Sequence, residues 1–240
     1  MKKVLWQELR RTEFENAVKG DAVVIIPVAS TEQHGHHLPV NTDANCCFTI
    51  ALRAAEAVDE FPVLVLPTIW TGYSPHHMPH PGTITLKYHT FVEVLTQVAA
   101  SVHAHGFQKI LFLNGHGGNS AVVAAMRTKL AAEEGVSVVG YTYWELPSVP
   151  EEWKRISQSD KGFVGHAAEI ETSMQLYLQP ELVDMGAAVW VPGVFGDPST
   201  ATREKGERLH KAAVNALVGI LRDYHSGQLE DTLVWRKEIL

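Results

Sequence analysis

Four short, mostly apolar runs alternate along the chain with longer segments whose apolar residues recur at helical spacing. The runs cover residues 22–29, 61–67, 109–114 and 136–143, and helices are expected between them at 43–60, 87–105 and 119–134. Each run is apolar throughout and not only at every second residue, which is typical of a strand buried on both faces. The sequence therefore predicts an α/β fold with a mostly parallel sheet that is covered by helices on both sides.

The remaining segments extend the same pattern. Helices are expected at 12–19, 165–178 and 200–224, a short strand at 188–191, and polar loops at 71–84 and 145–164. No low-complexity linker or internal repeat interrupts the sequence. A chain of 240 residues can build one sizeable core or two small ones. The unbroken alternation favours a single domain over residues 1–240.

Composition argues against several classes of partner. The net charge of −7 is unfavourable for binding nucleic acid or an anionic membrane surface. No apolar run approaches the length of a membrane span, and the first residues lack the apolar stretch of a signal peptide. The only cysteines, Cys46 and Cys47, are adjacent, so no disulfide framework is expected. These features predict a cytoplasmic protein with no membrane or nucleic-acid partner.

The stretch from Glu32 to Asp43 concentrates side chains that bind metals. It holds two carboxylates and three histidines, namely Glu32, His34, His36, His37 and Asp43. It directly follows the first buried strand, and the carboxyl ends of parallel strands are where α/β proteins place their chemistry. Mixed nitrogen and oxygen donors suit a divalent metal such as zinc, manganese or iron. The acids could instead cap a helix or order the loop, but their position around His34 favours metal binding.

A second candidate segment, Asn114 to Asn119, leaves the third strand and opens a helix. Glycines on both sides of His116 let the backbone turn sharply, with the histidine at the apex. Such a turn can also be a phosphate cradle or simply a tight connection, but it lacks the glycine spacing of a dinucleotide motif and the lysine of a phosphate loop. We therefore interpret His116 as a ligand that meets the Glu32–Asp43 stretch at one edge of the sheet.

The third candidate segment covers residues 165–173. His166 and Glu169 are spaced to share one face of the expected helix, whereas Glu171 would lie nearly opposite. A histidine and a glutamate three residues apart can offer two donors to one metal centre, although such pairs are also common on solvated faces. The apolar neighbours Ile170 and Met174 indicate that this face is buried, which favours a functional pair.

Several segments, taken in order, resemble the creatininase family. They are Ser30–Gly35 with His37–Pro39 and Thr42–Asp43, then Pro81–Ile84, Asn114–Asn119 and His166–Ser173, and finally Gly196–Pro198 with Ala201–Thr202 and Glu204–Gly206. The resemblance covers most of the chain, from about residue 20 to 210. It implies a three-layer α/β/α fold, a site for two divalent metal ions (zinc, manganese or iron) and a homo-oligomer, often a hexamer.

The resemblance also implies ligands, position by position. Glu32, Asp43 and His116 would bind one metal, and His34 and Asp43 the other, with Asp43 bridging. In one branch of the family a further carboxylate lies two residues after the histidine of the turn, and here that position is Gly118. We therefore expect Glu169 to supply the missing ligand, as another branch implies. The departure argues against creatinine as the substrate.

These ligands predict a hydrolytic mechanism. Two ions sharing Asp43 would hold a hydroxide between them that attacks the substrate, and His166 is the expected catalytic residue that protonates the leaving nitrogen. Gly117, Gly118, His76 and His77 are candidates for substrate contact, with plain exposure an equal alternative for the two histidines. The predicted function is hydrolysis of a non-peptide C–N bond, in a cyclic amide or formamide, of a small polar molecule.

Two alternatives remain open. The same activated water could cleave a C–C bond in a keto-inositol, since the family includes such an activity alongside the cleavage of amides, formamides and a modified peptide. The site could also be a structural or sensory metal centre in a non-enzymatic protein. Structural centres are usually tetrahedral and rich in thiolates, whereas the expected ligands here are mostly oxygen donors.

Overall fold

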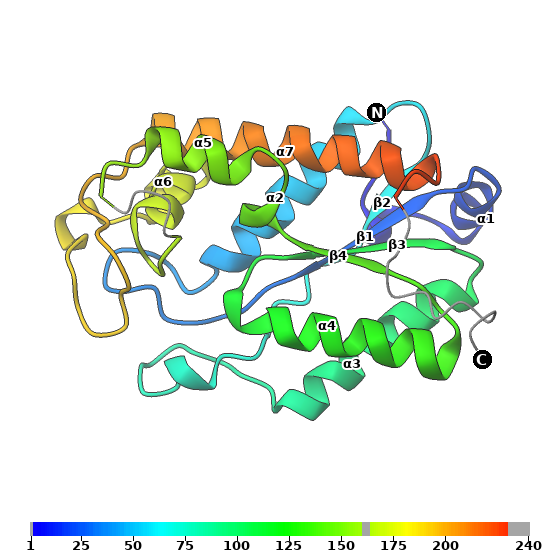
Figure 1. Cartoon of the computed structure of the whole chain (residues 1–240), viewed down its shortest axis with the longest axis horizontal. Coiled ribbons are helices and arrows are strands. Elements are labelled where there is room, and N and C mark those ends of the chain that lie inside the picture. The colour runs from blue at the N-terminus through cyan, green and yellow to red at the C-terminus, as the bar shows by residue number, and fades with distance from the viewer. Residues whose placement is uncertain (1, 160–163, 230–240) are drawn as a thin grey trace.

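The computed structural model describes residues 2–159 and 164–229, and its centre is a parallel sheet. The strands are β1 (Val23–Val28), β2 (Val63–Val65), β3 (Lys109–Asn114) and β4 (Val139–Thr142). Their order in the sheet is β2-β1-β3-β4, and each neighbouring pair is parallel. The predicted parallel sheet is therefore confirmed, with β1 and β3 at its centre (Figure 1).

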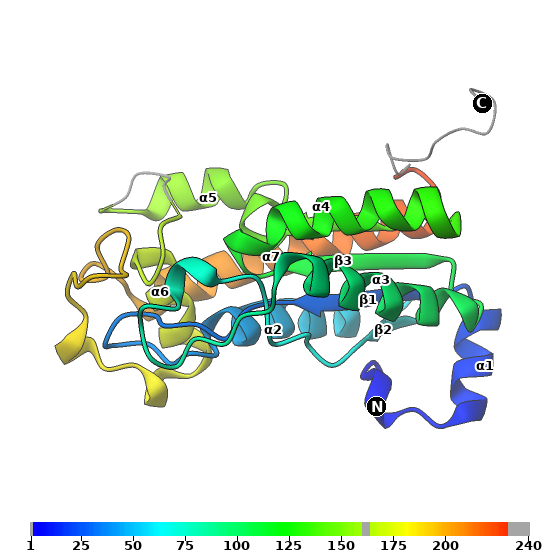
Figure 2. The same cartoon turned by 90° about the horizontal axis from the view of Figure 1, so that it is seen from below.

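Helices cover both faces of the sheet, which gives three layers. Val23 and Ile25 pack into one core cluster with α2 (Thr42–Ala57) and α7 (Arg203–His225). Alternate residues of the same strand, Val24 and Ile26, pack into a second cluster with the helices of the other face. Those helices are α1 (Arg11–Lys19), α3 (Tyr88–Ala104) and α4 (Ser120–Lys129). Figure 2 shows α3 and α4 side by side on this face. The three-layer α/β/α prediction is confirmed.

Two expectations for the second half of the chain are wrong. The expected loop at 145–164 contains α5 (Val149–Ile156), whose residues Val149, Trp153 and Ile156 are buried at helical spacing. The expected strand at 188–191 is not a strand, and the chain there follows a short turn of helix at Met185–Ala187. A run of only four apolar residues does not show whether the segment is a buried strand. Here Val189 and Trp190 are exposed.

Helix α6 (Glu169–Leu178) begins four residues later than expected, so His166 lies before the helix and not on it. Gly165 and Ala167 have left-handed backbones, with φ of 69° and 51°, so the helix cannot extend back through them. His166 lies between them in an extended segment that bridges to Phe195. Its position is therefore not set by the face of α6.

Short helical turns complete the structure. The 3-10 turns are Trp6–Glu8, Pro75–His77, Gly117–Asn119, Tyr143–Glu145, Pro180–Leu182 and Met185–Ala187, and a π-helical turn at Leu130–Glu134 ends α4. No helix in residues 2–159 and 164–229 combines the length and apolar character needed to cross a bilayer. The site lies where β1 and β3 end, because Val28 pairs with Asn114 and the loops after them start side by side.

Candidate metal centre

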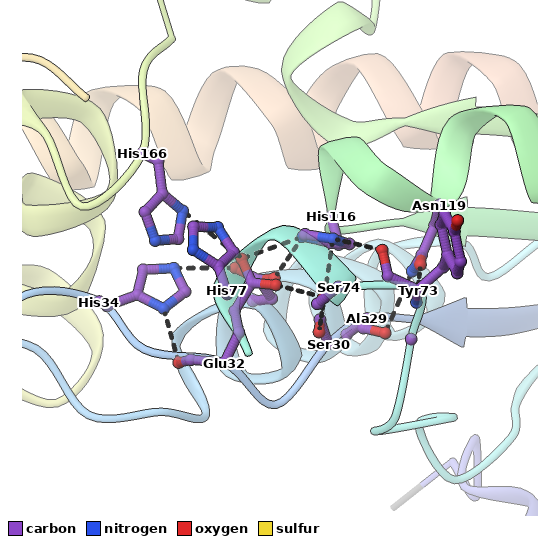
Figure 3. Close-up of polar contacts among 12 residues, drawn as sticks. Ala29, Ser30, Glu32, His34, Tyr73, Ser74, His77, His116, Asn119 and His166 are labelled. Atoms are coloured by element: carbon purple, nitrogen blue, oxygen red, sulfur yellow. Dashed lines mark hydrogen bonds and ion pairs between the residues drawn. The ribbon is translucent and has the colours of Figure 1, made fainter. Parts of the chain in front are cut away.

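Four of the predicted ligands converge at the carboxyl edge of the sheet, and each comes from a separate position in the fold. Glu32 and His34 lie in the loop after β1, Asp43 lies in the first turn of α2, and His116 lies at the turn after β3. All four are at most 5% exposed. Figure 3 shows His34 and His116 on either side of Glu32. The convergence follows from the parallel sheet, which brings these loops together.

Asp43 lies between the two histidines and directs one oxygen toward each. Its Oδ1 is 3.1 Å from His34 Nε2, and its Oδ2 is 3.1 Å from His116 Nδ1. The same His116 nitrogen lies 3.1 Å from Glu32 Oε1. Asp43 thus places one carboxylate oxygen beside each of two buried histidine nitrogens.

Several of these atoms lack any hydrogen-bond partner among the described residues. Glu32 Oε1, His34 Nε2 and Asp43 Oδ2 are all buried and without such a partner. Buried polar atoms are almost always paired, and buried charges are paired or bind metals. The unpaired atoms are also those that point at one another, so the donor set fits a pair of divalent cations with mixed nitrogen and oxygen ligands.

Hydrogen bonds around the cluster orient the histidines for metal binding. His34 donates from Nδ1 to the carbonyl oxygen of Glu32, at 3.1 Å, which leaves Nε2, facing Asp43, as the nitrogen available to a metal. His116 donates from Nε2 to Ser74 Oγ, at 3.0 Å, which leaves Nδ1 as the nitrogen available to a metal. Ser74 in turn donates to Glu32 Oε2. Outer hydrogen bonds of this kind fix ligand orientation in metal sites.

The charges of the cluster favour cations. Burial works to lower the pKa of His34, but the carboxylates of Asp43 and Glu171 outweigh it and hold that pKa well above its ordinary value. Burial likewise opposes the shift of His116, yet Asp43 and Glu32 raise its pKa to about 10. The same negative field that holds protons on these rings attracts a divalent ion, which would replace them.

The structure corrects the assignment of the fifth ligand. Glu169 points away from the cluster and pairs with Lys205, and it also accepts hydrogen bonds from Ser157 and Ser159. Glu171 instead directs Oε2 to within 3.6 Å of His34 Nε2. Glu169 was expected at the site because it would share a helix face with His166, but α6 starts after His166. Glu169 and Glu171 lie two residues apart on the helix and so point in nearly opposite directions. Glu171, and not Glu169, is therefore the carboxylate of α6 that lies within ligand distance of the cluster.

The environments of the two glutamates agree with this assignment. Burial opposes the shift, but Lys205 and the surrounding hydrogen bonds lower the pKa of Glu169 to about 2, so its charge already has a partner. Glu171 accepts a hydrogen bond from the backbone N–H of Ala167, at 2.6 Å, and also faces His34. The left-handed backbone of Ala167 is what turns that N–H toward the carboxylate.

The remaining predicted site residues line a cavity of about 390 Å³ beside the cluster. His166, His76, His77, Gly117 and Gly118 all contribute to its wall. His166 Nδ1 and His77 Nε2 each lie 3.5 Å from Glu32 Oε1. The sequence analysis missed the other lining residues, namely Trp144, Val164, Gly165, Glu171 and Phe195. Trp144 follows a strand end, which was a usable signal, whereas nothing in the local sequence placed Phe195 here.

Gly118 occupies a position with no room for a side chain. A Cβ atom there would lie 2.4 Å from the carbonyl oxygen of Tyr73 and 2.5 Å from His116 Nε2. At Gly117 a Cβ would meet nothing within 4 Å. The close packing of this turn against Tyr73 and His116 therefore leaves no room for a carboxylate side chain at position 118.

A larger hollow, of about 760 Å³, lies at the opposite edge of the sheet beside α1. Its walls are mainly apolar, including Trp6, Phe14 and Phe107. Among the described residues, the groups of histidine, aspartate and glutamate at ligand distances all lie at the carboxyl edge. Size alone therefore does not mark the functional site.

Comparison with known proteins agrees with this geometry. The family model for creatinine amidohydrolase matches residues 7–221. The creatinine amidohydrolase of Pseudomonas putida is 28% identical, over 92% of this chain and 97% of its own. A mycofactocin precursor peptide peptidase of Mycolicibacterium smegmatis is 31% identical over 80% of this chain and 81% of its own. A 3-dehydro-scyllo-inosose hydrolase of Thermotoga maritima is 30% identical over 78% of this chain and 60% of its own.

Solved structures show the same likeness in three dimensions. A crystal structure of creatininase superposes with a TM-score of 0.82, at 29% identity over 92% of this chain and 97% of that one. A manganese form gives 0.80, at 28% identity over 92% and 98%. A mutant described as the Zn-Zn type gives 0.82, at 28% identity over 93% and 98%. The chain therefore belongs to the creatininase family.

Proposed function

We propose that this family member is a hydrolase that uses two divalent metal ions to cleave a non-peptide C–N bond, in a cyclic amide or formamide, of a small polar molecule. The observation that carries the proposal is Asp43, whose two carboxylate oxygens each lie 3.1 Å from a different buried histidine. Burying a carboxylate between two histidines is costly for a stable core, because buried charges must be paired or bind metals, and such a cost is usually kept for a functional site.

The geometry supports two ligand sets that share Asp43. Glu32 Oε1, Asp43 Oδ2 and His116 Nδ1 form the first set. His34 Nε2, Asp43 Oδ1 and Glu171 Oε2 form the second. Three protein ligands at each ion leave coordination positions open, as in catalytic sites. Oxygen-rich sets with one histidine each suit zinc, manganese or iron.

Divalent ions held there would supply a water acidic enough to act as a nucleophile at neutral pH and would polarise the carbonyl oxygen of the substrate. The chain supplies the proton transfers. His166 donates from Nε2 to the backbone oxygen of Gln33, at 2.7 Å, so its Nδ1 is a lone pair facing the cluster. Burial lowers the pKa of His166, which keeps the ring neutral and able to accept a proton at Nδ1. The same atom can then protonate the leaving nitrogen.

The cavity sets the size of the substrate. Its volume of about 390 Å³ lies at the small end of the usual range for ligand sites. Its wall combines aromatic surface, from Trp144 and Phe195, with the polar edges of His76 and His77. A small, polar and partly planar molecule fits such a wall.

A substrate panel tests this proposal directly. The protein would be loaded separately with manganese, zinc and iron and offered cyclic amides, formamides and keto-inositols, with products identified by mass spectrometry. Turnover of a cyclic amide or a formamide supports the proposal. Cleavage of only the keto-inositols would assign C–C hydrolysis, and two bound metals without turnover of any compound would favour a non-enzymatic metal protein.

We also propose that the chain forms a homo-oligomer such as a hexamer. Among the described residues, the exposed large apolar side chains lie in loops and short 3-10 turns within residues 40–84 and 182–195, at the end of the molecule that carries the site (Figure 1). They are Val40, Trp70, Met78, Ile84, Leu182, Met185, Val189, Trp190 and Phe195. Clustered apolar exposure of this kind usually marks an interface. Light scattering coupled to size-exclusion chromatography tests this, and a monomer at micromolar concentration would contradict it.

A further inference from the structure

Gln33 lies between His77 and His166, and its amide orientation is fixed by two backbone groups. Its Oε1 accepts a hydrogen bond from the N–H of Gly35, at 3.0 Å. Its Nε2 donates to the carbonyl oxygen of Gly193, at 2.7 Å. A backbone N–H can only donate and a backbone carbonyl can only accept, so the amide cannot be flipped. Gln33 therefore has one amide hydrogen left to donate.

The backbone also fixes where His166 carries its proton. His166 Nε2 lies 2.7 Å from the carbonyl oxygen of Gln33, which only accepts, so Nε2 must carry the hydrogen. The Gln33 amide nitrogen is also 3.0 Å from His166 Nε2, but two donors cannot bond to each other. The remaining amide hydrogen is then directed to His77 Nδ1, which lies 3.0 Å away.

This assignment gives the two rings opposite roles on the side that faces the cluster. His77 accepts at Nδ1 and therefore presents an N–H at Nε2, whereas His166 donates at Nε2 and presents a lone pair at Nδ1. Both of the facing atoms lie 3.5 Å from Glu32 Oε1. The rings stack with their centroids 4.2 Å apart, so the donor and the acceptor are side by side (Figure 3).

The assignment also decides between two uses of His77. Glu32, His77 and His166 have donor atoms close enough together to hold a metal ion. A histidine binds a metal only through a nitrogen that carries no proton. The nitrogen that His77 presents carries its proton, so His77 is unsuited to a third metal and suited to a negatively charged oxygen.

We propose that His77 is a catalytic hydrogen-bond donor, whose Nε2–H binds the substrate oxygen that becomes negative during attack, and that Gln33 is the positioning residue that holds His77 in this tautomer. The inference rests on the hydrolytic function proposed above. His77 is 3% exposed and lines the cavity, so its N–H has little competition from water. Loss of one such donor typically lowers kcat by about 10²–10³-fold.

Nuclear magnetic resonance of the zinc-loaded protein, labelled with ¹⁵N in histidine, tests the tautomers. Long-range ¹H–¹⁵N correlations distinguish Nε2–H from Nδ1–H rings, and His77→Phe identifies the His77 signals by their loss. The wild-type protein should show the Nε2–H form for both His77 and His166. In Gln33→Glu, which replaces the amide donor with an acceptor, the proton of His77 should move to Nδ1. Gln33→Met, which cannot donate, should abolish the tautomer preference.

Inorganic phosphate at millimolar concentration serves as the oxyanion probe. It should shift the Nε2–H resonance of His77 in the wild-type protein and leave unaltered the ring resonances of His89, which is exposed on α3 and lies outside the cavity. An Nδ1–H tautomer for His77, a third bound metal, or no response to phosphate would each overturn the inference. A metal content below two per chain would instead count against the proposed function, so the two failures are distinguishable.

Discussion

The two glutamates of α6 provide the sharpest mutational test, because they lie two residues apart and have different partners. Glu169 is fully buried against Lys205, whereas Glu171 faces His34. The changes Glu169→Gln and Glu171→Gln are chemically identical, so each is the matched control for the other. We expect the first to lower the stability of the fold and the second to remove a metal.

The size of the first effect follows from the buried pair. Glu169→Gln leaves the ammonium of Lys205 buried without a carboxylate; among the described residues it keeps the carbonyl oxygen of Thr200, at 2.7 Å, and can bond the new amide oxygen. Breaking a buried ion pair costs about 3–5 kcal/mol, and the retained hydrogen bonds place this case near about 3 kcal/mol. For a chain of this size, the melting temperature should fall by about 6–12 °C.

Glu171→Gln should have the opposite profile. The amide oxygen can still accept from the N–H of Ala167, so the metal-free protein should lose only about 1 kcal/mol of unfolding free energy. The metal content after reloading should fall from two ions per chain to one. Thermal unfolding in the presence of a chelator and metal analysis by mass spectrometry provide the two readouts. Two metals in Glu171→Gln together with one in Glu169→Gln would refute the assignment.

Three further results follow from the same site. Gly118→Ala should weaken metal binding at His116 and destabilise the fold by about 1–3 kcal/mol, because its Cβ would lie 2.4 Å from a backbone oxygen, whereas Gly117→Ala should leave both unchanged. Ser74→Ala removes the hydroxyl bonded to Glu32 and His116, and should lower metal affinity about 10–100-fold by isothermal calorimetry without changing the fold. The raised histidine pKa values mean that the metal-free site holds protons at neutral pH, so metal affinity should rise with pH. Calorimetry in buffers of different ionisation enthalpy should then show proton release, and its absence would contradict the electrostatic account.

The sheet and the convergence of four of the five candidate ligands could be predicted from the sequence for one physical reason. A continuously apolar strand must be buried on both faces, so the strands are parallel and their carboxyl ends meet at one edge. Glu32, Asp43 and His116 follow or face those ends, and they come together in the structure as expected. The apolar pattern of the local sequence predicted a parallel sheet, and a parallel sheet places these candidate ligands close together.

The choice between Glu169 and Glu171 could not be made in this way. It depends on where α6 begins, and that start is set by the left-handed backbone at Gly165 and Ala167 together with the bridge between His166 and Phe195. Such a long-range contact leaves no periodic pattern in the sequence. Helix α5, by contrast, had a usable signal in its buried residues at spacings of four and three, with acidic residues in its first turn.

The loop residues that orient the site were missed for a related reason. Ser74 and Gln33 act through hydrogen bonds to atoms far away in the sequence, such as His116 Nε2 and the carbonyl oxygen of Gly193. Irregular segments have no hydrophobic period from which the direction of a side chain can be read. Only the folded structure shows that these two polar side chains connect the ligands and the cavity.

The central claim is that Asp43 bridges two metal ions, and metal content tests it most directly. The wild-type protein and the variants Asp43→Ala and Glu32→Ala would be saturated with manganese or zinc, dialysed and analysed by mass spectrometry, with circular dichroism confirming that each is folded. The account predicts about two ions per chain in the wild type, a large loss of both in Asp43→Ala, and mainly one lost in Glu32→Ala. Zero or one ion in the wild-type protein, or a folded Asp43→Ala variant that keeps both, would contradict it.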